Sequence, residues 1–428
     1  MSAGPEGWSE RPGTWQGRPL PTHGRSWAGR LILAVCLVWA AAPCPAQDVD
    51  AVRRRLEALG PTAKCTLDDA GRLTGIAIED GAAVTAADVA AFAALPDLRR
   101  LQILDCRTLD DAMVAELTAG PRLESLGLTN TVLGDASVEA IARAFPDLVE
   151  LDLSSNTNLS PAAIKWIADL GKLRRLTLMQ TRLNDLGSRR LAKLRDLETL
   201  DLRGNMEAGD MTLAVVAGLP KLRNFKHRSS AVTDDGLARL AESRSLESLL
   251  IQDFGITSAA GPQLAKLRTL ESLEIFRCSG FGSAGVLALA GLPLTRLTLR
   301  DLPDVGDEAL TVLQKLPQLR RLALHELASV GDRGAAELSA ARQLETLDIW
   351  SLPTLTDATA EVIAALPALR ELSIRETGMT EAAALKFAAI PGLESLTFRN
   401  NGPLSAAAAA RIKERRWKKL DLGAATAP

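Results

Sequence analysis

The sequence is poor in the residues that enzymes most often use for acid–base and nucleophilic chemistry. It contains no tyrosine and only three histidines, one of which lies in the amino-terminal segment. No H-E-x-x-H, C-x-x-C, G-x-S-x-G or glycine-rich phosphate-binding motif occurs. Catalysis needs a nucleophile, a base and an orienting group in one cleft. The sequence therefore predicts a protein that is not an enzyme, with no cofactor, no catalytic residues and no metal.

Cysteine is also scarce, and its distribution does not indicate a disulfide framework. Of five cysteines, two lie in the amino-terminal segment, which leaves Cys65, Cys106 and Cys278. This number is odd, and no two of these thiols lie at metal-ligand spacing. We expect them to be buried structural thiols.

The sequence also has no excess of positive charge. The 428 residues include 50 basic and 52 acidic side chains, for a formal net charge of −2. A general nucleic-acid-binding protein would have a strongly basic balance. We therefore expect no nucleic-acid partner.

The first 46 residues differ from the rest of the chain. A polar lead with four arginines is followed by the apolar run LILAVCLVWAAA (31–42) and then by PCPAQ. This order is typical of a secretory signal peptide, with Ala46 before the cleavage site. The run is shorter than the ~20 residues that a membrane-spanning helix needs. We predict a secreted, periplasmic or cell-envelope protein, with an uncleaved amino-terminal anchor as the alternative.

A nine-residue frame recurs through the remainder of the chain. Its clearest copy is LVELDLSSN (148–156), which fits L-x-x-L-x-L-x-x-N. Frames follow one another every 24 or 25 residues without a gap. They begin at residues 73, 98, 123, 148, 173, 197, 222, 246, 270, 294, 319, 344, 369, 393 and 417. A fixed period of this length indicates a repeat architecture.

The frame resembles that of the leucine-rich repeat family, and the segments between frames resemble the short-helix repeats of bacterial members and of eukaryotic F-box receptors. The resemblance implies an α/β solenoid of about 15 repeats. Alternation of Leu151 and Leu153 predicts a strand with one buried face. In TDDGLARLAE, Thr233 and Asp234 favour a helix start. We expect a curved horseshoe with a parallel sheet on its concave face and short helices on its convex face.

Both ends of the repeat array are predicted to be capped. Residues 47–72 are interpreted as an amino-terminal cap of a helix and a hairpin, residues 73–416 as repeats, and residues 417–428 as a capping strand and tail. Arg53, Arg54 and Arg55 are expected on the solvated face of the cap helix. Six basic residues between 411 and 419 are expected to guard the last strand edge, with a site for an acidic envelope polymer as the alternative.

The concave face carries the best functional signal. Frame positions three, five and seven should point away from the core into the hollow. From the sixth repeat on, position seven is rich in arginine and aromatic residues, which are enriched at the centres of interfaces. Stacked strands would place these residues in a column roughly 40 Å long. The predicted partner-binding residues are Arg203, Arg228, Phe276, Arg300, His325, Trp350, Arg375 and Arg399, with Gln252 between them.

One frame is irregular. LRNFKHRSS (222–230) places His227 where the neighbouring frames have Leu202 and Ile251, so its imidazole should point into the core. We expect a hydrogen-bonded core histidine. The alternative is a local irregularity that bends the solenoid.

Three functions remain compatible with these features. The first is an exported, non-enzymatic binding module that recognises a protein or an anionic glycan through its concave face. The second is an intracellular substrate receptor of ubiquitin-ligase type, for which residues 1–46 do not supply the adaptor domain. The third is an envelope protein that assembles with copies of itself. Oligomeric state does not follow from the sequence.

Overall fold

The computed structural model of the protein describes residues 49–423. These residues belong to a unit that spans Gln47–Pro428. The predicted leader lies outside the described residues. Among the residues described, no helix is both long enough and apolar enough to cross a membrane.

Sixteen strands form one sheet in which each strand pairs with its neighbours in sequence. β1 pairs antiparallel with β2, and every later pairing is parallel. The strands are β1 (Ala63–Leu67), β2 (Leu73–Ile78), β3 (Arg100–Leu104), β4 (Ser125–Thr129), β5 (Glu150–Asp152), β6 (Arg175–Thr177), β7 (Thr199–Asp201), β8 (Asn224–Arg228), β9 (Ser248–Gln252), β10 (Ser272–Phe276), β11 (Arg296–Arg300), β12 (Arg321–His325), β13 (Thr346–Leu352), β14 (Glu371–Thr377), β15 (Ser395–Arg399) and β16 (Lys419–Asp421).

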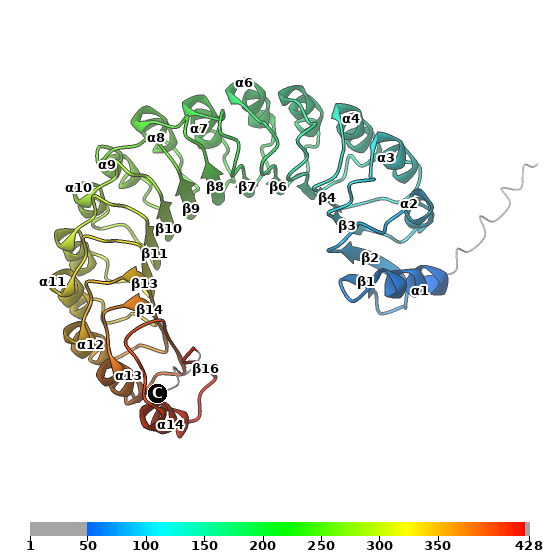
Figure 1. Ribbon diagram of the computed structural model, residues 1–428. Coiled ribbons are helices and arrows are strands. Elements are labelled where there is room, and N and C mark those ends of the chain that lie inside the picture. The colour runs from blue at the N-terminus through cyan, green and yellow to red at the C-terminus, as the bar shows by residue number, and fades with distance from the viewer. Residues whose placement is uncertain (1–48, 424–428) are drawn as a thin grey trace, which may run out of the picture. The chain divides into compact units, whose positions relative to one another are not determined.

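A helical segment follows most strands and returns the chain to the start of the next. The α-helices are α1 (Val49–Leu59), α2 (Ala86–Ala93), α3 (Asp111–Leu117), α4 (Asp135–Ala144), α5 (Ile164–Ile167), α6 (Asp185–Ser188), α7 (Asp210–Ala217), α8 (Asp234–Leu240), α9 (Ala260–Leu264), α10 (Ser283–Leu287), α11 (Asp332–Ala335), α12 (Asp357–Ala364), α13 (Glu381–Ala388) and α14 (Ala406–Lys413). Short 3₁₀ helices are η1 (Pro161–Ala163), η2 (Arg189–Lys193), η3 (Asp307–Lys315) and η4 (Ala336–Ala340). Figure 1 shows the strands on the inner side of the arc and the helices on its outer side.

The predicted fold class is confirmed, and β2–β16 supply one parallel strand for each sequence frame. In β9, Leu249 and Ile251 at frame positions four and six are buried, whereas Ser248, Leu250 and Gln252 are half-buried. The alternation therefore places positions three, five and seven on the inner surface of the sheet, which we call the concave face. Leucine, isoleucine and valine from successive repeats form one continuous core.

The turn that leaves each strand has its own chemistry. Position eight adopts a left-handed conformation in most frames, including Asp105, Gly204 and Asn400. Where position nine is polar, its side chain forms hydrogen bonds with backbone groups of the buried turn. The Asn156 amide donates to Leu128 O at 2.6 Å and Leu153 O at 2.9 Å. Such bonds leave few backbone groups in the turn without a partner.

In the amino-terminal cap, the expectation that all three arginines of the run lie on the solvated face is wrong for Arg55. α1 buries Val52 and Leu56, and Gly60 ends the helix with a φ of 111°. Arg55 does not simply face solvent, because its Nε donates to Asp88 Oδ1 at 2.7 Å. Asp88 is buried in the first turn of α2, so this ion pair ties the cap to the first repeat.

At the carboxy-terminal end, some of the basic residues between 411 and 419 have a structural role. Arg415 donates to four backbone carbonyls at the junction between the preceding repeat and its own, those of Ala388 (at 3.0 Å), Ile390, Pro391 and Leu393. Its guanidinium also lies 4.8 Å from the Trp417 ring centroid. Lys418 pairs with Glu394. These contacts fit a capping role for this segment.

Candidate functional site

The structure brings the eight predicted site residues into one row on the concave face, which we call the position-seven column. Strand register places each residue directly beside the next from Arg228 to Arg399, with Gln252 in the row. Arg203 follows the end of β7, beside Arg228, whose carbonyl accepts from Gly204 N at 3.1 Å. All members are half-buried except Arg399, which is exposed.

Arginine and aromatic side chains stack in the middle of the position-seven column. The Arg300 guanidinium lies 4.3 Å from the Phe276 ring centroid and 4.8 Å from that of Trp350. Arg375 lies 5.6 Å from the Trp350 centroid. His325 meets the same indole edge-on at 5.8 Å. Cation–π contacts of this kind hold the long arginine side chains in place over the sheet.

Every arginine of the column has a carboxylate partner within the chain. Arg300 Nε donates to Glu326 Oε2 at 2.8 Å, and Arg375 Nη2 donates to both oxygens of Asp348. The remaining pairs are Arg203 with Asp201, Arg228 with Asp253, and Arg399 with Asp421. The column is therefore close to neutral overall, although its surface is rich in hydrogen-bond donors.

Asp348 forms hydrogen bonds with two members of the column, His325 and Arg375. Burial raises the pKa of this carboxyl group, but hydrogen bonds from His325 and Ser373, the charge of His325 and a hydrogen bond from Arg375 outweigh burial and lower the pKa to about 2. The His325 Nε2 to Asp348 Oδ2 distance is 2.9 Å. Asp348 is thus held as a carboxylate at neutral pH.

One donor in the column has no acceptor. Within residues 49–423, the Nε of Arg375 is buried and makes no hydrogen bond. A buried donor without an acceptor costs free energy, of the order of 1–3 kcal/mol.

The predicted orientation of His227 is confirmed. Its ring is fully buried between Phe225 and Phe254. Nε2 lies 2.7 Å from Ala208 O, and Nδ1 lies 3.1 Å from Leu202 O. The turn of this frame also differs: within residues 49–423, Ser229 is the one position-eight residue between frames 98 and 393 that is not left-handed. His227 therefore belongs to the core and lies beneath the column.

The buried thiols are confirmed at Cys106 and Cys278, whereas Cys65 is half-buried. All three are free. Burial raises the pKa of the Cys278 thiol to about 12. Within the described part of the chain, no group of three or more His, Cys, Asp or Glu side chains could hold a metal ion.

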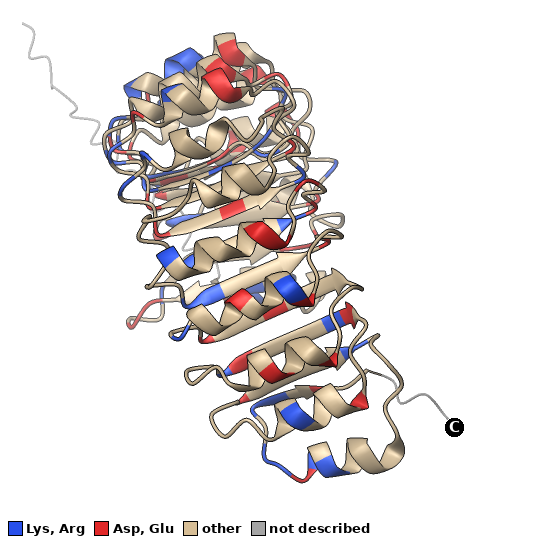
Figure 2. Ribbon diagram, turned by 90° about the vertical axis from the view of Figure 1, so that its left-hand side faces the viewer, with Lys and Arg blue, Asp and Glu red and all other residues tan. Residues whose placement is uncertain are grey.

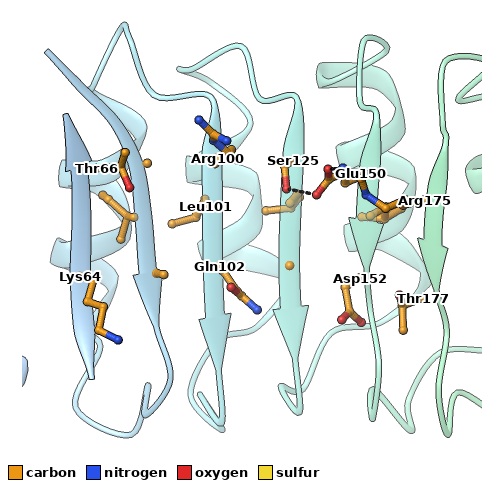
Figure 3. Close-up of a pocket in the computed structure, with 16 residues that line it drawn as sticks. Lys64, Thr66, Arg100, Leu101, Gln102, Ser125, Glu150, Asp152, Arg175 and Thr177 are labelled. Atoms are coloured by element: carbon orange, nitrogen blue, oxygen red, sulfur yellow. Dashed lines mark hydrogen bonds and ion pairs between the residues drawn. The ribbon is translucent and has the colours of Figure 1, made fainter. Parts of the chain in front are cut away.

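A pocket with a mixed polar and apolar lining on the concave face of the amino-terminal repeats was not anticipated from the sequence. It has a volume of about 460 Å³ and is lined by residues of β1 to β6. Figure 3 shows Arg100, Gln102, Glu150 and Asp152 around it. Two glycines, Gly75 and Gly127, stand at concave frame positions, and they are the sequence signal that could have located this hollow.

Charge is mixed over the surface elsewhere. Figure 2 shows basic and acidic residues interspersed along the helices and strands on the side that it displays. No broad region of one sign dominates this view. This distribution favours specific contacts over general attraction of a polyanion.

Comparisons with known proteins agree with the observed architecture. A family model described as "Leucine-rich repeat region" matches residues 130–413. No curated protein matches the chain by sequence. A chain of the yeast Rad7–Elc1 complex is similar in structure, with a TM-score of 0.52 and 18% identity, over 75% of this chain and 80% of that one.

Two further solved structures have lower scores. An internalin from Listeria monocytogenes gives a TM-score of 0.44 and 18% identity, over 83% of this chain and 95% of that one. A chain of the TLR13–ssRNA13 complex gives 0.43 and 18%, over 77% of this chain and 50% of that one.

Proposed function

Because the chain belongs to the leucine-rich repeat family, we propose that it is an exported, non-enzymatic module that binds a protein partner through its concave face. The position-seven column is the proposed contact surface. A solenoid with this geometry presents an extended concave surface on rigid strands, which suits recognition of another macromolecule.

The observation that carries this proposal is the continuous row from Arg228 to Arg399. Its central members, Phe276, Arg300 and Trp350, are half-buried on the concave face although nothing in the core requires them there. Tryptophan and arginine contribute most of the binding energy in many interfaces.

A protein partner is favoured over an anionic glycan. All five arginines of the column already bind carboxylates of the same chain. A polyanion would have to compete with these carboxylates, whereas a protein can offer acceptors, donors and apolar groups together.

Affinity capture from envelope extract of the native host tests the contact surface. The concave variant carries Arg300→Glu, Trp350→Ala and Arg375→Glu. The matched control carries Arg143→Glu, Lys165→Glu and Trp166→Ala, because this convex tryptophan also lies under two cations, at 5.3 and 4.2 Å. We expect the concave variant to lose the partner and the control to retain it.

Other outcomes of this capture would count against the proposal. Equal retention by both variants would place the contact outside the position-seven column. Capture of no protein, together with concentration-dependent self-association on sizing, would favour an assembly of identical chains.

The exported location is tested separately. We expect the protein in the secreted or envelope fraction of its host, with a mature chain that begins at Gln47. Fractionation followed by amino-terminal sequencing would reveal this end. A cytoplasmic protein that retains Met1 would instead favour a receptor that works inside the cell.

A further inference from the structure

The amino-terminal pocket is a second feature of the concave face, separate from the position-seven column. It is lined by β1 to β6, whereas the column begins after β7. Its lining residues include concave frame positions, where an extended segment of a bound protein could reach them.

The floor of the pocket is a gap at Gly127. Strand register places Gly127 between Gln102 on β3 and Asp152 on β5, all at frame position five. A Cβ atom at Gly127 would lie 3.2 Å from Gln102 Cγ and 3.9 Å from Asp152 Cβ. Gly127 is itself buried and the Gln102 side chain lies against it, so the absent side chain leaves a shallow slot between an amide and a carboxylate.

Asp152 lacks a counterion. Within residues 49–423, its hydrogen-bond donors are Ser154 N at 2.9 Å and Ser154 Oγ at 2.6 Å. Burial raises the pKa of this carboxyl group despite these bonds, and the charge of Asp201 adds to the rise. Glu150, two residues earlier, pairs with Arg175 instead. Asp152 is thus a partly desolvated carboxylate without a cation beside it.

A cation without a partner lies on the opposite wall. In the described part of the chain, Arg100 is exposed, and its guanidinium makes no hydrogen bond or ion pair although its backbone belongs to β3. It occupies frame position three of β3, two strands and two residues away from Asp152. Strand spacing and rise put their Cα atoms about 12 Å apart.

We propose that this pocket binds a lysine or arginine side chain of a protein segment, with Asp152 as its counterion, Gly127 providing the slot and Arg100 binding an acidic side chain of the same segment. An extended peptide places side chains i and i+2 on one side, about 7 Å apart. The two side chains can therefore reach toward Asp152 and Arg100 together. The inference rests on the proposed function in taking the ligand to be a protein.

Capped tripeptides probe this chemistry on the full-length protein. The three probes are acetyl-Lys-Gly-Glu-amide, the same peptide with norleucine in place of lysine, and the same peptide with glutamine in place of glutamate. We expect saturation-transfer NMR to give the first probe about tenfold tighter binding than the norleucine probe. Loss of the glutamate charge should weaken binding by a smaller factor, because Arg100 is exposed.

Variants of three lining residues test whether these differences arise in the pocket. Asp152→Asn should abolish the preference for lysine over norleucine, and Arg100→Gln should abolish the preference for glutamate over glutamine. Gly127→Leu should block all three probes; its Cβ would lie 3.2 Å from Gln102 Cγ, so Gln102 must move aside, and a thermal melting curve checks that the variant still folds. Glu274→Gln, a concave acid at the same frame position of β10, is the matched control and should leave binding unchanged.

Three results would contradict the proposed binding of a basic side chain in this pocket. The inference is overturned if the wild type binds no probe, if it binds lysine and norleucine probes equally, or if Asp152→Asn keeps the preference. The concave triple variant of the column should bind the probes like the wild type. Failure of the capture experiment and failure of this one are therefore distinguishable.

Discussion

His227 replaces an aliphatic side chain of the repeat with a ring that has two polar atoms. Both ring nitrogens face carbonyl oxygens, but a neutral imidazole carries only one N–H. Leu202 O already accepts from the Asn205 amide at 3.0 Å. We therefore expect the proton on Nε2, where it is donated to Ala208 O.

The buried ring makes stability depend on pH. Burial lowers the pKa of His227, while its bonds to Ala208 and Leu202 oppose the shift. The unfolded chain, with a histidine pKa of about 6.5, then binds a proton that the folded protein does not. The free energy of unfolding should fall by up to about 1.4 kcal/mol per pH unit below pH 6.5, and be fully retained above it.

Urea unfolding at pH 7.5 and pH 5.5 measures this effect. His227→Gln should weaken the difference between the two pH values. An unchanged difference in His227→Gln would show that other groups cause the acid sensitivity.

Asp152 changes the free energy of unfolding with pH in the opposite direction to His227. Because burial raises the pKa of its carboxyl group, the ionised form is disfavoured in the folded protein at neutral pH, and the penalty is relieved as pH falls through the raised pKa toward 3.8. Asp152→Asn should therefore increase stability at pH 7 by up to about 1 kcal/mol. Thermal unfolding at pH 7 and pH 4 would measure this, and a lower melting temperature of the variant at pH 7 would contradict it.

At the scale of elements, the helices are linked by carboxylates at their amino-terminal ends. Asp234, the first residue of α8, accepts from both the backbone N and the hydroxyl of Thr257 in the next repeat, at 2.9 and 2.6 Å. Asp210 and Asp357 make the same contacts with Thr233 and Thr380. Carboxylates at helix starts could be predicted from the sequence, whereas their bonds to the following repeat depend on how the repeats stack.

Asp234→Ala removes this link and should cost about 0.5–2 kcal/mol, as for the loss of a helix cap. Asp235→Ala is the matched control, since Asp235 lies in the same turn of α8 but is exposed and, within residues 49–423, its carboxylate has no hydrogen-bond partner. Chemical denaturation of both variants gives the comparison. Equal losses would assign the effect to the helix dipole alone.

Over the whole molecule, each repeat packs mainly against its two neighbours, as in a one-dimensional array. Leu202 lies in the core between β6 and β8 and is fully buried. Leu202→Asp would place an unpaired charge there and should destabilise the protein by more than about 3 kcal/mol.

Hydrogen exchange would show how far this damage extends. We expect protection to be lost first around β6 to β8 and the adjoining α6 and α7, and retained longest in β13 to β15. Leu202→Met, which conserves volume, should cost less than about 1.5 kcal/mol. Retained stability in Leu202→Asp would contradict the assignment of frame position six to the core.

The repeat sequence alone determined the fold class, the strand for each frame and the face on which each side chain lies. Strand periodicity is local, so Leu249 and Ile251 point inward wherever the repeat is placed. For the same reason the position-seven column and the inward His227 could be predicted without coordinates.

Only the tertiary structure decided which charges meet. Arg300 pairs with Glu326 and Arg375 with Asp348, across 26 and 27 residues of sequence, because neighbouring strands bring side chains of different repeats together. The pocket at Gly127 arose in the same way, from one missing side chain between Gln102 and Asp152 on adjacent strands. Periodicity determines the direction of a side chain, whereas its partners depend on the reach and rotamers of residues one repeat away.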